Sequence, residues 1–159
     1  MIWRRIFSRG DAALSEASAR DAASIATLHV ASFRRGWSED EVERLIAERN
    51  VIVHRAVDGR ALRGFIMSRL ASDEAEILSV AVASAAQGRG LARKLLDLHL
   101  RRLAGLGCRA IFLEVDENNA AAIRLYRRAG FREVSRRANY YSGAGGKSAA
   151  ALVLRRDLD

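Results

Sequence analysis

One stretch limits the possible folds of this chain more than any other: a strand, a glycine turn and a leucine-rich helix follow one another over residues 79–103. The first turn of such a helix has unpaired N–H groups and the positive end of the helix dipole. The turn Gln87-Gly88-Arg89-Gly90 also lets a ligand approach the backbone closely. It therefore predicts a pyrophosphate site, although it is neither a Walker loop nor a complete dinucleotide fingerprint. A tight turn without a ligand is the alternative.

The rest of the chain predicts a mixed sheet with helices on it. Asp58-Gly59 is typical of a tight hairpin, and Ser38 and Glu41 have the spacing of a capping box at the start of a helix. Hydrophobic patterning predicts strands at residues 14–18, 51–57, 62–70, 76–82, 109–115, 131–138 and 149–156. It predicts helices that begin near Asp21, Ser38, Leu91 and Asn118. On the first helix the spacing places on one face Ile25, Leu28, His29, Ser32 and Phe33.

These elements predict a single α/β (α+β) domain over residues 1–159, with a mixed, mostly antiparallel sheet flanked by helices. The length fits one domain, and no linker or repeat interrupts the pattern. Residues 1–10 combine arginines with apolar side chains and lack the apolar core of a secretory signal. We therefore expect them to form a basic amphipathic arm.

Composition excludes several classes of protein. A single cysteine, Cys108, rules out a disulfide scaffold and fits a reducing compartment; we interpret it as a small core residue. No apolar run approaches the ~20 residues of a membrane span, so no membrane partner is expected. His29, His54 and His99 lack metal-ligand spacing, which predicts structural or surface roles and no metal. The net charge of +8 reflects either codon composition or an acidic partner, such as a phosphorylated cofactor or a nucleic-acid-rich assembly.

Two residues in the second half could carry proton transfer. Glu114 lies in an apolar stretch that should be a buried strand, and a buried carboxylate is costly unless it is paired or functional. Tyr126 follows twelve residues later, on a predicted helix. Glu114 could act as a general base and Tyr126 as a general acid. The alternative is that Glu114 pairs with an arginine while Tyr126 fills the core.

The spacing Gln87-x-x-Gly90-x-Ala92, between a strand and a helix, resembles the Q/R-x-x-G-x-G/A signature of the GNAT superfamily of acetyl-CoA-dependent N-acetyltransferases. The second half is similar to the RimI type, which acetylates the N-terminal alanine of a small-subunit ribosomal protein. That likeness rests on Leu113-Glu114-Val115, residues 118–123, Leu125-Tyr126 and Gly130-Phe131. Residues 136–141 also resemble that type, and residues 36–38 near the front resemble it more loosely. The likeness covers about residues 21–154.

The resemblance implies direct transfer from acetyl-CoA to a protein N-terminal amine, without a metal. It implies that Glu114 is the general base and Tyr126 the general acid. Family sheets splay beside the strand at residues 80–82, so that a backbone N–H there polarises the thioester carbonyl. The implied acetyl-CoA contacts are Val80, Ala81, Val82, Gly88, Arg89, Gly90, Leu91, Ala92, Arg93 and Asn119.

Two positions depart from the RimI pattern, and both fall in substrate-facing regions of that family. Gly36 stands where proline is common before Trp-Ser, and Ser148-Ala149 follow the glycine-rich turn where acidic residues are common. A GNAT enzyme of a small amine or a lysine side chain is one alternative. A non-enzymatic basic RNA-binding module is another, although an RRM aromatic motif is missing. We expect a cytoplasmic enzyme that does not bind DNA directly.

Overall fold

The computed structural model describes residues 12–142 and 148–158, which contain every predicted strand and helix. The strands are β1 (Ala13–Glu16), β2 (Val51–Asp58), β3 (Ala61–Ala71), β4 (Glu74–Val82), β5 (Ala110–Asp116), β6 (Arg132–Ser142) and β7 (Ser148–Asp157). The α-helices are α1 (Ala22–Ser32), α2 (Glu39–Ala47), α3 (Leu91–Gly105) and α4 (Ala120–Arg128). β6 continues past its predicted end at residue 138. The expected arm at residues 1–10 and the glycine-rich residues 143–147 lie outside the described residues.

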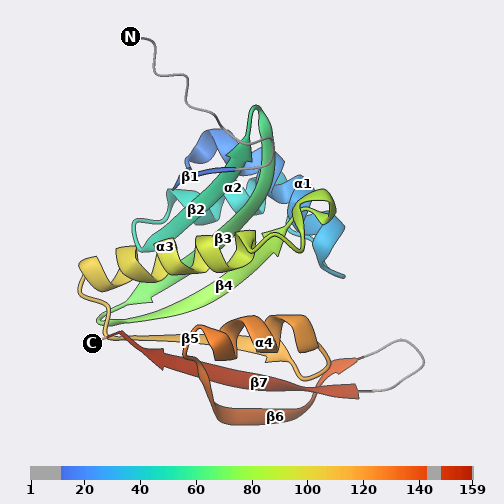
Figure 1. Ribbon diagram of the computed structural model, residues 1–159, viewed down its shortest axis with the longest axis vertical. Coiled ribbons are helices and arrows are strands. Elements are labelled where there is room, and N and C mark those ends of the chain that lie inside the picture. Colours follow the sequence, from blue (N-terminus) through green and yellow to red (C-terminus); the bar gives the residue numbers. More distant parts are fainter. Residues whose placement is uncertain (1–11, 143–147, 159) are drawn as a thin grey trace.

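The strands form one sheet in the order β1-β2-β3-β4-β5-β7-β6 (Figure 1). Neighbouring strands are antiparallel except β4 and β5, which run parallel, so the predicted mixed and mostly antiparallel sheet is confirmed. The parallel join is short: residues 74–76 of β4 pair with residues 110–112 of β5. Beyond these three pairs the two strands separate. The end of β4 therefore has backbone groups with no strand partner on its β5 side.

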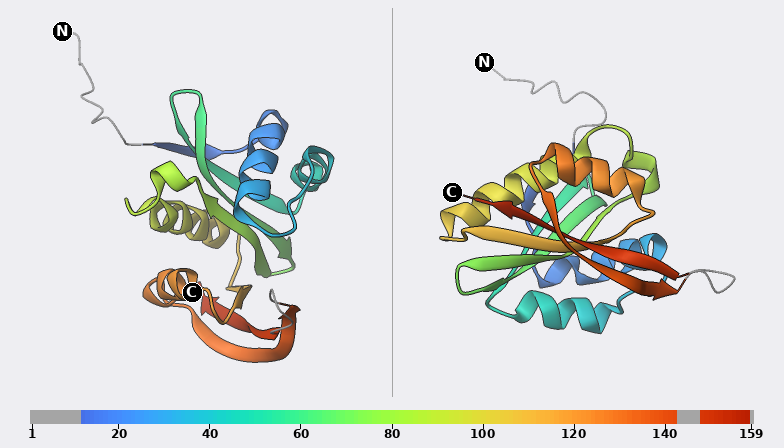
Figure 2. Two further views of the ribbon diagram at one scale, coloured as in Figure 1. Left: turned by 90° about the vertical axis from the view of Figure 1, so that its right-hand side faces the viewer. Right: turned by 90° about the horizontal axis from the view of Figure 1, so that it is seen from below.

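Helices cover both faces of this sheet. α3 and α4 lie on one face, and α1 and α2 lie on the other (Figure 2). The fully buried side chains beneath α3 include Leu95, Leu96, Leu103, Ile111 and Leu154, and Cys108 is buried in the same core as predicted. The core beneath α1 and α2 contains Ile25, Val42, Phe65 and Met67. No helix in the described residues is long and apolar enough to cross a bilayer.

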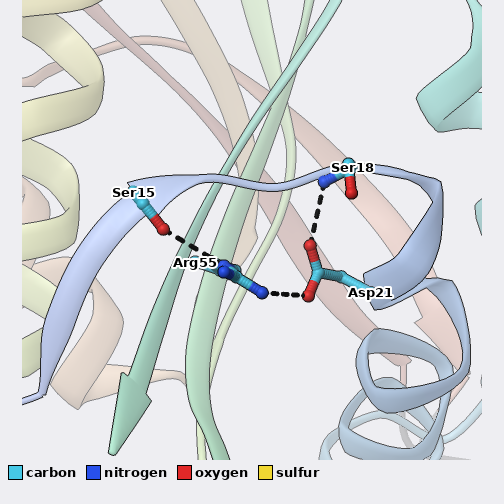
Figure 3. A network of polar contacts seen from close by, with 4 residues as sticks. All are labelled: Ser15, Ser18, Asp21 and Arg55. Atoms are coloured by element: carbon cyan, nitrogen blue, oxygen red, sulfur yellow. Dashed lines mark hydrogen bonds and ion pairs between the residues drawn. The ribbon is translucent and has the colours of Figure 1, made fainter.

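A buried carboxylate fixes the start of α1 against the sheet (Figure 3). Asp21 accepts hydrogen bonds from the Ser18 backbone N–H at 2.9 Å and from the Arg55 guanidinium at 2.5 Å. Arg55 also donates to the Ser15 hydroxyl at 3.1 Å. Because a buried charge is costly without a partner, the pairing of Asp21 with Arg55 restricts where α1 can lie on β2. The position of α1 matters because this helix forms one wall of a large cavity beside the end of β4.

The three histidines are all buried, so their interpretation as surface residues is wrong and the structural one holds. His54 on β2 and His99 on α3 place their Nδ1 atoms 2.7 Å apart, and His99 Nε2 lies 2.6 Å from the Ser68 hydroxyl. One Nδ1 atom of the pair must carry a hydrogen and the other must accept it. Burial lowers the pKa of His54 and lowers the pKa of His99 to about 3, with the neighbouring His54 adding to the effect on His99. Both rings are therefore neutral in the folded protein near neutral pH.

This histidine pair predicts that stability falls as the solution becomes acidic. Below the unfolded pKa of about 6.5, the unfolded chain binds protons that the buried rings exclude, so its free energy drops relative to the folded state. For each excluded proton, the free energy of unfolding falls by about 1.4 kcal/mol for every pH unit by which the solution is acidified. For His99 this fall continues until the pH nears the folded pKa of about 3. Urea unfolding of the original protein and His99→Gln, between about pH 7 and pH 5, should show a shallower pH dependence in the variant. Parallel pH dependences would contradict this assignment.

Candidate active site

The turn after β4 has the geometry that its glycines predicted. Gly88 and Gly90 have φ angles of 78° and 75°, in the left-handed region that favours glycine. Gly90 caps α3 without a side chain, so the N–H groups of the first helical turn remain available to a ligand. Gln87 donates from Nε2 to the carbonyl oxygen of Val82 at 3.0 Å and so ties the turn to the end of β4. The dipole of α3 is therefore directed at the space beside β4.

A cavity of about 690 Å³ lies between this turn and α4. Nine of the ten residues implied as acetyl-CoA contacts line it, from β4, the turn, α3 and the N-cap of α4; Arg89 is the exception. Asn119 is held at the start of α4, where its Oδ1 accepts from the Ala122 N–H at 3.2 Å. The cavity is also lined by Gln87 of the predicted turn, by Tyr126, the predicted general acid, and by six residues that the sequence did not indicate as contacts: Ala86, Ala121, Ala122, Arg124, Leu125 and Arg128. The cavity thus unites segments separated by about one third of the chain.

This cavity suits an anionic ligand. Arg93, Arg124 and Arg128 are the charged residues among its described lining residues, which include no carboxylate. Arg124 and Arg128 are one helical turn apart on α4, on either side of Tyr126. That spacing was visible in the sequence, but only the packing of α4 places these arginines at the cavity. Residues 12–142 and 148–158 also contain no group of three or more His, Cys, Asp or Glu suited to a metal ion.

Tyr126 lies on the inner wall of the same cavity. Its side chain is buried, and its ring packs edge to face against Phe131 with centroids 5.5 Å apart. Burial raises the pKa of the Tyr126 hydroxyl to about 12, so the hydroxyl keeps its proton at neutral pH. Tyr126 therefore packs as a core residue and also keeps the proton that a general acid needs. Its interpretation as a core residue and its interpretation as a general acid are compatible.

A second cavity, of about 750 Å³, lies across the end of β4 from the first. A second wall is formed by α1 together with Phe33, the residue that follows this helix. A third wall is the hairpin between β2 and β3. The two cavities share five lining residues: Val80, Ala81, Val82, Gln87 and Asn119. The end of β4 is therefore a wall of both cavities, so ligands bound in the two cavities could approach each other there.

Glu114 is placed differently from the expectation. Its side chain is 27% exposed, not deeply buried, because Leu113 and Val115 point to the α3 and α4 face and Glu114 points to the opposite face of β5. Its Oε1 lies 3.1 Å from Arg137 Nη1, as the arginine-pairing alternative predicted. Glu114 lines neither of the two cavities above but a smaller one of about 360 Å³, beside Glu76. Tyr126 and nine of the ten implied acetyl-CoA contacts are thus brought together, and Glu114 is set apart from them.

Comparison with known proteins gives this arrangement a family. Residues 22–131 match the acetyltransferase (GNAT) family. The chain belongs to the GNAT acetyltransferase family. It is an acetyl-CoA-dependent N-acetyltransferase with acetyl-CoA as its co-substrate, so the alternative of a non-enzymatic RNA-binding module is set aside.

Individual GNAT proteins resemble the chain over most of its length. It is 36% identical over 117 residues to the [ribosomal protein bS18]-alanine N-acetyltransferase of Salmonella typhimurium. The aligned residues make up 74% of this chain and 78% of that protein. The crystal structure of the ribosomal-protein-S18-alanine N-acetyltransferase from Escherichia coli superposes with a TM-score of 0.86, at 26% identity, over 93% of this chain and 94% of that one. Arabidopsis thaliana NAA60, solved with acetyl-CoA, shares the fold with a TM-score of 0.79, at 20% identity, over 92% of this chain and 98% of that one.

The glycine turn gives a direct test of where acetyl-CoA binds. At about 100-fold excess over its dissociation constant, acetyl-CoA should stabilise the original protein by roughly 2.7 kcal/mol. Gly90→Asp should abolish this stabilisation, because its carboxylate would face the pyrophosphate at the start of α3. Thermal melts with and without acetyl-CoA measure the effect.

Gly107→Asp provides a matched control. Gly107 lies at the other end of α3, has a φ of 88°, and, like Gly90, has nothing within 4 Å of an added Cβ atom. Both variants therefore carry similar backbone strain. Gly107→Asp should keep the acetyl-CoA shift; a shift that also survives in Gly90→Asp would place the pyrophosphate elsewhere.

Proposed function

We propose that this enzyme transfers the acetyl group of acetyl-CoA directly to the α-amine of a protein N-terminus, the N-terminal alanine of a small-subunit ribosomal protein. The observation that carries the proposal is the pair of cavities that share the end of β4, one suited to the co-substrate and one open to an acceptor. The similarity to a bS18-alanine N-acetyltransferase over three quarters of the chain supports the choice of acceptor. A ribosomal acceptor also implies a cytoplasmic location, which is part of this proposal.

The charges in the second cavity favour an α-amine over a lysine side chain. An amine must be neutral to attack, and an α-amine has a pKa of about 7.7–8.0 where lysine has about 10.4. Arg60 is the only charged residue among the described lining residues of this cavity. A lysine ammonium would meet a cation there and no carboxylate. An α-amine loses its proton more readily and so suits the cavity better.

The proposed reaction uses three features of the chain. Backbone N–H groups at the end of β4, on the side where β5 has separated, would polarise the thioester carbonyl and stabilise the tetrahedral intermediate. Tyr126, protonated at neutral pH, would donate its proton to the departing CoA thiolate. Glu114 would accept the proton of the amine through water, since it lines neither of the two cavities itself. The nitrogen–carbon bond forms first and gives the tetrahedral intermediate; the carbon–sulfur bond then breaks as the thiolate leaves, without an acetylated enzyme.

Substitution of Glu114 tests its role as the base. Glu114→Gln keeps the size of the side chain but removes its charge, so the rate near neutral pH should fall by about 10²–10⁴-fold. The loss should shrink as the pH rises past the pKa of the acceptor amine, because the amine then arrives neutral. Steady-state rates across this pH range, together with the melting temperature, measure both effects.

Arg137→Gln is the matched control for Glu114→Gln. It removes the same ion pair but leaves the carboxylate in place. An exposed pair of this kind contributes about 0–1 kcal/mol to stability, so neither variant should unfold. If Glu114 serves only as the partner of Arg137, the two variants should behave alike. A large loss of rate confined to Glu114→Gln supports the base.

The acceptor itself is tested by offering acetyl-CoA with a panel of acceptors. The panel contains peptides with a free N-terminal alanine, including one with a ribosomal sequence, the same peptides with a blocked N-terminus and an internal lysine, and small amines. Mass spectrometry of the products should show a single acetyl group on the free α-amine of the alanine peptides. Acetylation of the blocked peptides or of the small amines alone would overturn the proposed acceptor and favour the lysine or small-amine alternative.

A further inference from the structure

His29 is a buried imidazole on α1 that the proposed chemistry does not use. Its ring stacks on Trp37 with centroids 4.0 Å apart and planes 11° apart, and it contacts the Phe33 ring at 4.4 Å. The backbone N–H of Trp37 donates to His29 Nδ1 at 3.0 Å. Nδ1 is therefore an acceptor, and the hydrogen of the neutral ring lies on Nε2. One side chain thus contacts both ends of the segment that joins α1 to α2.

The same segment is held at two further points. A Cβ atom on Gly36 would lie 2.4 Å from Val30 Cγ2 and 2.7 Å from Val30 Cα, so residue 36 rests directly on α1. Ser38 forms the capping box of α2, with the Glu41 N–H donating to its hydroxyl at 3.1 Å. This close approach explains why glycine, and not the proline common in RimI-type enzymes, precedes Trp37. The path of the segment is therefore set by contacts with α1, not by a rigid proline ring.

This segment ends at the wall of the second cavity. Phe33 lines the cavity and is 40% exposed, and the other wall residues from α1 include Leu28 and Ala31. On α1 the predicted single face is thus divided: His29 points inward to the core, and Phe33 forms part of the wall. Leu62, from the opposite hairpin, adds a further apolar side chain. An apolar wall of this kind suits an uncharged side chain beside the reacting amine, and the methyl group of the proposed N-terminal alanine is small and uncharged.

We propose that His29 is a positioning residue for the acceptor: by stacking on Trp37 and accepting its N–H, it holds Phe33 as the wall that recognises a small, uncharged N-terminal residue. This inference rests on the function proposed above. A phenylalanine at position 29 could stack in the same way, but it would leave the Trp37 N–H without its acceptor. The imidazole supplies both the aromatic face and the acceptor atom, which is the physical reason for a histidine here.

The test measures kcat and KM for an alanine-terminated peptide, and the Kd for acetyl-CoA, in a set of variants. His29→Phe, which keeps the ring and removes the acceptor, should raise the peptide KM by about 5-fold or more. The kcat and the acetyl-CoA Kd should stay within about two-fold of the original values, because the first cavity is unchanged. His29→Ala should raise the peptide KM further, and His29→Asn, whose amide oxygen can replace Nδ1, should recover part of the loss relative to His29→Ala.

A double variant shows whether His29 acts through Phe33. If it does, His29→Phe combined with Phe33→Ala should raise the peptide KM no more than Phe33→Ala alone. Additive effects of the two substitutions would overturn the proposed route.

His54→Asn controls for destabilisation, because His54 is equally buried but lies beneath α3, on the opposite face of the sheet. It should lower the melting temperature and leave the peptide KM unchanged. An unchanged peptide KM in His29→Phe, or an equal rise in His54→Asn, would overturn the positioning role of His29 and leave the proposed function standing. An original protein that does not acetylate the peptide at all would instead overturn the proposed function.

Discussion

The short parallel join between β4 and β5 is the constraint on which the rest of the site depends. Three residue pairs hold the two halves of the sheet together, and past residue 76 the strands diverge. In an unbroken sheet, the backbone groups at the end of β4 would bond to the next strand and could not meet a ligand. Because the strands separate, those groups are free to face a ligand. α3 and α4 then line the space between the two halves, and both cavities take the end of β4 as a wall.

Opening a sheet in its middle requires that its two halves be stabilised from elsewhere. The apolar core beneath α3 contains residues from both halves, including Leu95 and Leu96 of α3, Ile66 of β3 and Leu154 of β7. Contacts between buried polar groups also connect the helices to the sheet: the Asp21–Arg55 pair connects the start of α1 to β2, and the His54–His99 contact connects β2 to α3. Such groups are costly to bury without partners, so they restrict how the helices can be placed. These contacts thus restrict where α1 and α3, which contribute wall residues to the two cavities, can lie.

The positive charge of the chain has an explanation in this geometry. Arg93, Arg124 and Arg128 converge on the cavity proposed for acetyl-CoA, which carries several phosphate charges. Arg93 also pairs with Asp97, and other arginines pair with carboxylates on the surface, as Arg102 does with Glu16 and Arg136 with Glu117. Exposed pairs of this kind contribute little to stability. Acetyl-CoA bound in that cavity would account for part of the charge.

Local features of the sequence determined much of this structure. The Asp58-Gly59 hairpin, the Ser38 capping box and the glycine turn before α3 depend on residues within one turn of each other, so their geometry follows from the sequence directly. The GNAT fold was predicted from the resemblance of the turn and of the second half to that family, and the fold is confirmed. Nine of the ten implied acetyl-CoA contacts line one cavity, because they cluster in one strand, one turn and two helix starts. Arg89 was selected with them, although its side chain does not line the cavity.

Only the tertiary structure decided which distant residues meet. The exposure of Glu114 and its pairing with Arg137 depend on which face of β5 is covered and on the register of the two strands beyond it. The arginines of α4 reach the cavity because of how that helix packs, and His29 meets Trp37 because the intervening segment folds back onto α1. Hydrophobic periodicity identifies a face of a helix or strand but not the element that will lie against it. That choice is made by packing between segments far apart in the chain. For this reason the sequence determined the elements and the glycine turn, while the tertiary structure decided the walls of the second cavity.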